Sequence, residues 1–217
     1  MTKTKLTEEL LRKEASGFSS REGSHAEPSL FGVTDGKAVG TYLEQKFRAY
    51  VAGRYKIEEG NSARGIDFPD INVDMKVTSE KQPQSSCPFK SAREKIFGLG
   101  YSLLVFVYDK KDDEKRRAAT LKILHTIFIQ AHATGDFTTT KRLREMVMDG
   151  GNEDDIVAYL TDRHLPVDEI EVQKIAREIL KRPPSQGYLT ISNALQWRLQ
   201  YGRAIREAGT AHGVVRL

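Results

Sequence analysis

Cysteine and long apolar runs are almost absent from this chain of 217 residues, and each absence excludes a class of protein. Cys87 is the only cysteine, so no disulfide can form within the chain, and the composition fits a reducing compartment. No segment supplies the run of about 18 apolar residues that a membrane span requires, and the first thirty residues do not resemble a secretory signal. We therefore expect a cytoplasmic protein with no membrane attachment.

Two sequence patterns that would indicate a zinc site or an ATP site are also absent. The histidines are scattered without the spacing of zinc ligands, and no Walker-type glycine loop is present, so neither a zinc site nor ATP dependence is expected. The remaining composition, with 39% hydrophobic and 29% charged residues, describes a globular protein. A chain of this length can form one domain with an elaborated core.

Basic residues are concentrated at the C-terminal end. From Lys174 to Leu217 there are eight lysines and arginines against two acidic residues, whereas the rest of the chain is slightly acidic. Contact with a polyanion is the functional interpretation, because each neutralised phosphate releases condensed counterions. A merely solvated helix face is the alternative.

The most informative segment, Gly65 to Ser79, places charged side chains on an apolar strand. Side chains alternate between the two faces of a strand, so Asp74 and Lys76 share a face. Asp67 is expected to reach them from a preceding strand, across a tight turn at Phe68-Pro69-Asp70. Such an oxygen-rich pocket suits Mg²⁺, a hard ion that takes one or two carboxylates from a protein. Lys76 would lie beside the metal-bound water and help to orient or deprotonate it.

The spacing of Asp67 and Asp74-Met75-Lys76 resembles that of the PD-(D/E)XK nuclease superfamily, and the flanking sequence looks most like a type II restriction endonuclease. Upstream, Gly40 to Phe47 resembles the helix that precedes the catalytic hairpin in that family. Downstream, Ala92 to Tyr108 resembles the helix and the central strand that follow it. The resemblance covers roughly residues 38–110 and does not identify a recognition sequence.

Two features depart from the family pattern. Asp74 occupies a position where glutamate is commoner, and the gap from Asp67 is short, so Asp70 is an alternative first metal ligand. We favour Asp67, because a turn through residues 69–72 would put Asp70 at its tip, away from the pocket.

The resemblance implies a role for each residue of the pocket. Asp67 and Asp74, helped by the Met75 carbonyl, would bind Mg²⁺; Lys76 would position the attacking water; and Glu44 would shape the site or contact the groups around the ion without binding the ion directly. The reaction would be hydrolysis of phosphodiester bonds in double-stranded DNA at a short specific site. A double-strand cut at a palindrome is most simply made by a homodimer, and the resemblance also implies a cognate DNA methyltransferase as genetic partner.

The sequence pattern predicts a single α/β domain, with a restriction-endonuclease-like core in which helices flank a small mixed sheet. We expect an N-terminal helix and mobile arm over residues 1–37, the nuclease core over 38–110 and a helical DNA-binding part over 111–217. Apolar spacing predicts helices over Lys5–Ala15, Ala38–Ala52, Ser91–Phe97 and Ala118–His132. Four further helices are predicted with a cap residue before each: one capped by Thr140 and ending at Met148, Glu153–Leu160 capped by Asn152, Glu169–Leu180 capped by Asp168, and Asn193–Ala208 capped by Ser192. A buried strand is predicted over Tyr101–Tyr108, and a charged turn over Asp109–Arg117.

Two polar segments are candidates for contact with DNA. Glutamine pairs bidentately with adenine and hydroxyls bind phosphate, so the loop after the charged strand contributes Gln82, Gln84, Ser85 and Ser86. A recognition helix contacts base edges mainly with its N-terminal residues, so the predicted last helix contributes Ser192, Asn193 and Gln196 to base contacts and Arg198 and Arg203 to phosphate contacts. A solvated loop and ordinary core packing are the alternatives.

Two other functions are compatible with these observations. A structure- or damage-specific nuclease of the same superfamily would use the same pocket without reading bases. A noncatalytic DNA-binding regulator would keep the fold and the basic C-terminal region, although the intact set of Asp67, Asp74 and Lys76 argues against it.

Overall fold

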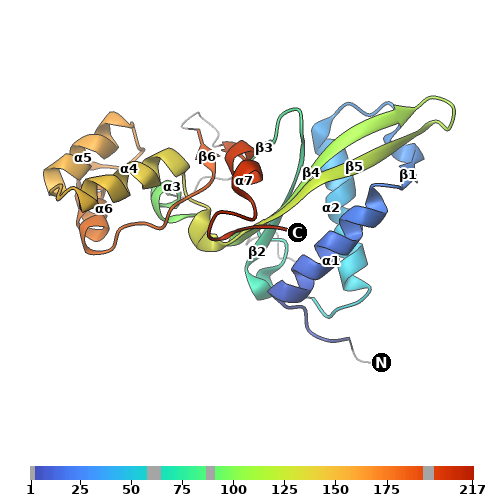
Figure 1. Cartoon of the computed structure of the whole chain (residues 1–217), viewed down its shortest axis with the longest axis horizontal. Helices are drawn as coiled ribbons and strands as arrows, with labels where there is room; N and C mark the ends of the chain where they lie inside the picture. The colour runs from blue at the N-terminus through green and yellow to red at the C-terminus, as the bar shows by residue number, and fades with distance from the viewer. Residues whose placement is uncertain (1–2, 58–64, 87–90, 193–197) are drawn as a thin grey trace.

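A five-stranded mixed sheet runs through the middle of the molecule (Figure 1). The computed structural model describes residues 3–57, 65–86, 91–192 and 198–217. The strand order is β1-β5-β4-β2, and β8 also pairs with β5; β2 runs parallel to β4, and the other pairings are antiparallel. The strands are β1 (Ala26–Glu27), β2 (Val73–Ser79), β4 (Ser102–Asp113), β5 (Ala118–Ile129) and β8 (Val214–Arg216). A mixed sheet within an α/β fold agrees with the prediction.

Helices α1 (Glu8–Glu22) and α2 (Gly36–Ala52) pack beside the sheet at one end of the molecule (Figure 1). Their apolar sides meet the sheet in an aromatic core, in which the Phe47 ring lies 5.0 Å from Phe18 and 5.1 Å from Phe106, measured between ring centroids. This core presses α2 against β2, so residues of the two elements can share a site. Short 3-10 turns occur at η1 (Pro28–Leu30), η2 (Pro69–Ile71) and η3 (Ala131–Ala133).

Four helices gather at the opposite end of the molecule (Figure 1): α3 (Arg93–Phe97), α4 (Phe137–Met148), α5 (Glu153–Asp162) and α6 (Glu169–Lys181). They enclose a separate apolar core that includes Ile96, Leu143 and Ile175. The caps predicted at Asn152 and Asp168 are confirmed, because each side chain accepts a hydrogen bond from the first turn of its helix.

A small three-stranded sheet lies between the two ends (Figure 1). It has the order β3-β7-β6, with all pairings antiparallel. Leu199 and Ile191 anchor it to a core that also contains Leu103 and Val105 of β4. Its strands are β3 (Gln84–Ser86), β6 (Thr190–Ile191) and β7 (Arg198–Gln200), and β7 leads into helix α7 (Gly202–Glu207).

The prediction of a helix over Ala118–His132 is wrong, because residues 118–129 form strand β5. β5 is a central strand with neighbours on both edges, and its last residues are buried whichever face they point to. A run of this kind cannot be told from a buried helix by apolar spacing alone. The charged turn predicted over Asp109–Arg117 is also too long, because β4 continues to Asp113.

The helix predicted over Asn193–Ala208 is wrong over much of its length. Residues 198–200 form β7, only residues 202–207 are helical, and residues 193–197 lie outside the described residues. Ser192 is therefore not a helix cap; its backbone N–H donates to the Arg198 carbonyl across the β6–β7 pair. The pairing of β7 with β3 joins segments more than a hundred residues apart, which no local pattern reveals.

Two smaller predictions are corrected near the helix ends. The first helix begins at Glu8 and continues to Glu22, because Phe18 is buried in the core; residues 16–22 are therefore helical and not part of a mobile arm. Asp136, not Thr140, caps α4. One carboxylate oxygen of Asp136 accepts from the Thr139 N–H (2.9 Å), and the other accepts from the Ile191 N–H of β6 (2.9 Å).

Asp136 thus connects the helical end to the small sheet, and we expect Asp136→Ala to lower the free energy of unfolding by about 2 to 4 kcal/mol. A lost cap costs about 0.5 to 2 kcal/mol, and a buried N–H left without a partner adds about 1 to 3 kcal/mol. Urea unfolding measures the change. The matched control is Asp168→Ala, which removes only an exposed cap and should cost about 1 kcal/mol; equal losses in the two variants would contradict the connecting role.

Candidate active site

The charged face of the edge strand β2 carries Asp74 and Lys76, as predicted from strand alternation, and the structure joins them in an ion pair. Asp74 and Lys76 lie on the same face, and the Lys76 Nζ is 2.6 Å from Asp74 Oδ2. Asp74 is buried, with 3% of its surface exposed, and Lys76 is partly buried. Because one edge of β2 pairs with β4, the other is available to groups from outside the main sheet.

Asp67 occupies this free edge. The Phe68 and Val73 backbones exchange hydrogen bonds of 2.9 and 3.2 Å, which fold the chain back around η2 and place Asp67 beside β2. Asp67 Oδ2 accepts the Met75 N–H at 2.9 Å. The N–H and the carbonyl of one strand residue point to the same edge, so the Met75 carbonyl also faces the edge that Asp67 occupies.

Helix α2 contributes two further charged groups, Glu44 and Arg48, which are four residues apart and therefore share a helix face. The Arg48 guanidinium lies 3.4 Å from Asp67 Oδ1, and Glu44 interacts electrostatically with Asp67, Asp74 and Arg48. Arg48 was not predicted from the sequence, although its spacing from Glu44 is a signal that could have found it. We call Glu44, Arg48, Asp67, Asp74 and Lys76 the carboxylate cluster.

The carboxylate cluster contains three carboxylates and two cations, and this imbalance affects the pKa values of its members. Burial and the nearby Asp67 raise the pKa of Glu44 to about 7, despite the opposing effect of Lys76. Burial also raises the pKa of Asp74, although Lys76 counteracts it. For Lys76 burial lowers the pKa, but the attraction of Asp74, Asp67 and Glu44 outweighs burial and the net shift is upward. The site therefore favours an additional positive charge.

Asp70, the alternative first ligand, lies elsewhere. It belongs to η2 and lines a small hollow together with Leu6 and Ile57. Among the described residues it makes no hydrogen bond or ion pair with the carboxylate cluster. The structure thus brings Asp67, Asp74, Lys76 and Glu44 together and leaves Asp70 outside.

The candidate DNA-contact residues are brought together only in part. Gln84, Ser85 and Ser86 form β3, which pairs with the β7 strand that contains Arg198. Gln82 is exposed in the turn before β3, Ser192 follows β6, and Asn193 and Gln196 lie outside the described residues. Arg203, on α7, stacks over the Phe137 ring at 3.6 Å from its centroid and lies 3.9 Å from Glu207, so its charge is engaged within the chain.

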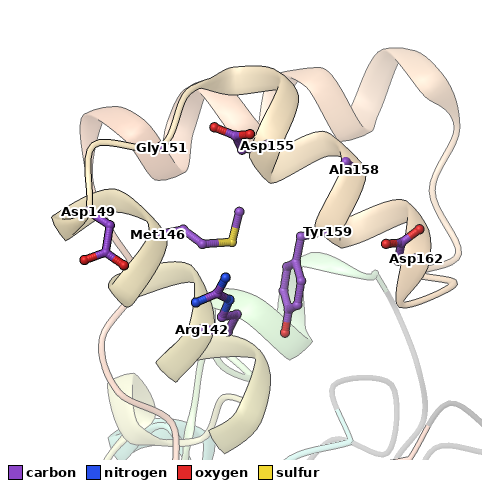
Figure 2. Close-up of a pocket in the computed structure, with 8 residues that line it drawn as sticks. All are labelled: Arg142, Met146, Asp149, Gly151, Asp155, Ala158, Tyr159 and Asp162. Atoms are coloured by element: carbon purple, nitrogen blue, oxygen red, sulfur yellow. The ribbon is translucent and has the colours of Figure 1, made fainter.

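A separate hollow lies between α4 and α5 (Figure 2), and it is not part of the carboxylate cluster. Its volume is about 390 Å³. Its charged lining residues are three aspartates, Asp149, Asp155 and Asp162, and one cation, Arg142. An acidic lining repels phosphate, so this hollow is unsuited to the DNA backbone. The helices of the described segments are also too short or too polar to cross a membrane.

Comparisons with known proteins place the chain in a family. A family model described as type II restriction enzyme NspV matches residues 5–216. The type II restriction enzyme NspV from Nostoc sp. is 62% identical over 212 residues, which cover 98% of this chain and 96% of that relative. No solved structure matches the chain.

The raised pKa of Glu44 predicts how stability depends on pH in protein freed of divalent ions. Between the unfolded-state pKa near 4.5 and the folded-state pKa of about 7, the folded protein binds the proton more tightly, so the free energy of unfolding should fall as pH rises. In Glu44→Gln, which carries no charge at this position, the free energy of unfolding should fall less over this pH range. The difference from wild type should be about 1 to 2 kcal/mol after allowance for contact with water. Urea unfolding at pH 5 and pH 8 in EDTA measures it. Parallel pH profiles of the two proteins would refute the shift.

Proposed function

Since the chain belongs to the family of the type II restriction enzyme NspV, we propose that the carboxylate cluster is its Mg²⁺-dependent cleavage centre. The protein is accordingly a sequence-specific restriction endonuclease, a site-specific deoxyribonuclease that acts on DNA. This membership favours it over a damage-specific nuclease and over a noncatalytic regulator. The observation that supports the location of the centre is that Asp67, at the free edge of β2, lies beside the Asp74–Lys76 pair on the face of the same strand.

The donors at this edge suit Mg²⁺. We propose Asp67, Asp74 and the Met75 carbonyl as its ligands, with Glu44 as a further contact; all are hard oxygens. Among the described residues no group of three or more His, Cys, Asp or Glu side chains forms a metal site by itself. Such a set is not required, because Mg²⁺ usually takes one or two protein carboxylates and fills its other positions with water and phosphate. When bound, the ion supplies Lewis-acid polarisation of the scissile phosphate.

Lys76 acts as a donor in this proposal. Its raised pKa keeps the amine protonated at neutral pH, so it can orient the attacking water by hydrogen bonding and offset the charge that grows on the phosphate. Asp74 holds the amine at 2.6 Å and thereby fixes its direction. The Arg48 guanidinium lies 3.4 Å from Asp67 Oδ1 and thereby fixes the direction of the Asp67 carboxylate.

We further propose that the fold is of the PD-(D/E)XK type. In support, α2 precedes β2 and packs against it, and β2 lies parallel to the buried strand β4. The proposed core over residues 38–110 and the proposed DNA-binding part over residues 111–217 belong to one structural domain, because β3 of the former pairs with β7 of the latter.

The finer biological context is proposed on the same basis. A symmetric cut of both strands favours a homodimer, which sedimentation analysis of the purified protein would show. A cognate DNA methyltransferase would protect host DNA, and both proteins would work in the cytoplasm.

Lys76→Ala tests the cleavage centre. We expect the rate of plasmid cleavage to fall about 10²- to 10⁴-fold, because a positioned proton donor is lost, while the Kd for the target duplex changes little. A digest of a sequenced plasmid with Mg²⁺, followed by mapping of the ends, gives the target site and the rate together. The control is the exposed Lys122→Ala, on β5, which should cut like wild type. Cleavage by Lys76→Ala at the wild-type rate would refute the proposed centre.

Thermal unfolding tests the metal ligands without relying on activity. At about ten times its Kd, bound Mg²⁺ should stabilise the protein by about 1.4 kcal/mol and raise Tm by about 3 to 5 °C. We expect this gain in wild type and in Asp70→Asn, but not in Asp67→Asn. A gain that survives in Asp67→Asn and is lost in Asp70→Asn would instead assign the first ligand to Asp70.

A further inference from the structure

The three-stranded sheet has two faces of opposite character. In an antiparallel pair, residues directly opposite each other point to the same face. Ser85, Leu199 and Ile191 are opposite one another and point inward, where Leu199 and Ile191 are buried and Ser85 hydrogen-bonds the Tyr201 hydroxyl at 2.6 Å. The neighbouring residues of each strand therefore point outward.

The outer face consists of two rows of polar side chains. Gln84, Gln200 and Thr190 are opposite one another and form the first row, and Ser86 and Arg198 form the second. Four of these residues are exposed, and Gln84 is partly buried. None is acidic. We call these five residues the outer face of the small sheet.

The outer face is anchored to the strand that carries the carboxylate cluster. Thr78 is buried and lies two residues after Lys76 on the same face of β2, a separation of about 7 Å. Its hydroxyl accepts the Gln84 N–H at 3.0 Å and lies 3.0 and 3.2 Å from the carbonyl oxygens of Gln84 and Gln82. The Tyr201 N–H adds a second tie, to the Pro83 carbonyl at 2.8 Å. The small sheet is thus held in a fixed position beside the cluster.

We propose that the outer face of the small sheet contacts base edges in the major groove of the DNA substrate, with Gln84 and Gln200 as specificity-determining residues. This inference rests on the proposed cleavage centre and adds to it the surface that selects the target. Adjacent glutamines match the donor and acceptor pattern of adenine, hydroxyls pair with several bases, and arginine binds guanine or phosphate. Sheets are known to enter DNA grooves in this way. Base recognition therefore does not require the recognition helix expected from the sequence.

Cleavage of a panel of duplexes tests this assignment. Once the wild-type site is mapped, each of its base pairs is replaced in turn, and kcat/KM is measured for wild type, Gln200→Ala and Gln84→Ala. We expect the preference of each variant for the cognate base to fall about ten- to a hundredfold at one base pair or a few, and Tm to stay unchanged for the exposed Gln200. The matched control is Gln173→Ala, an exposed glutamine on α6, which should keep wild-type discrimination throughout.

Two results would overturn the inference. One is wild-type discrimination at every base pair in both glutamine variants. The other is an equal loss of cutting on every duplex, which would indicate a structural or phosphate contact. A wrong assignment of the cleavage centre would be recognised separately, because Lys76→Ala would then cut at the wild-type rate. The preference of the glutamine variants for each base pair could still be measured in that case. If Gln84→Ala does not fold, Gln200→Ala alone decides the outcome.

Discussion

The ion pair between Asp74 and Lys76 is the interaction on which the arrangement of the site depends. A buried carboxylate costs free energy unless a cation accompanies it, and here the cation comes from the same strand, 2.6 Å away. The pair does not account for the whole cluster: Asp67 and Glu44 add two carboxylates, and among the cluster residues Arg48 adds one further cation. The fold therefore maintains a half-buried position with a surplus of carboxylates over cations, which is a suitable property for binding a divalent ion.

The elements around β2 explain how this surplus is maintained. The aromatic core fixes α2 against the strand, so Glu44 and Arg48 reach the site from a rigid helix. The Phe68–Val73 bridge folds Asp67 onto the free strand edge. On the same face of β2, Thr78 holds the small sheet. One strand thus positions both the groups proposed for cleavage and the surface proposed for base contact, and a rigid connection of this kind favours coupling between recognition and cutting.

The carboxylate cluster was largely predictable, whereas the proposed DNA-contact surface was predictable only in part: Gln84, Ser86 and Arg198 were expected to contact DNA, but their pairing in one small sheet was not. Asp74 and Lys76 were found because strand alternation is a local rule that holds over seven residues. Arg48 was missed because its partner, Asp67, is on another element. Thr190 was missed for a similar reason: it lies in a strand of two residues, too short for alternation to be recognised. Gln200 has a side chain of a base-reading type, but it was assigned to the predicted last helix and not to the three-residue strand β7. The segment around Leu199 was interpreted as a helix because its apolar residues also fit helical spacing.

The sequence by itself determined that Asp74 and Lys76 share a strand face, and it determined the helix α2, the strand β2 and the caps of α5 and α6, because propensity, alternation and capping act over a few neighbouring residues. Tertiary structure alone decided that residues 118–129 form a central strand and that residues 84–86 and 198–200 pair in one small sheet. Strand pairing supplies hydrogen-bond partners from distant parts of the chain. The free energy that selects a strand over a helix there comes from those partners and from burial between them, and neither is encoded in the local pattern.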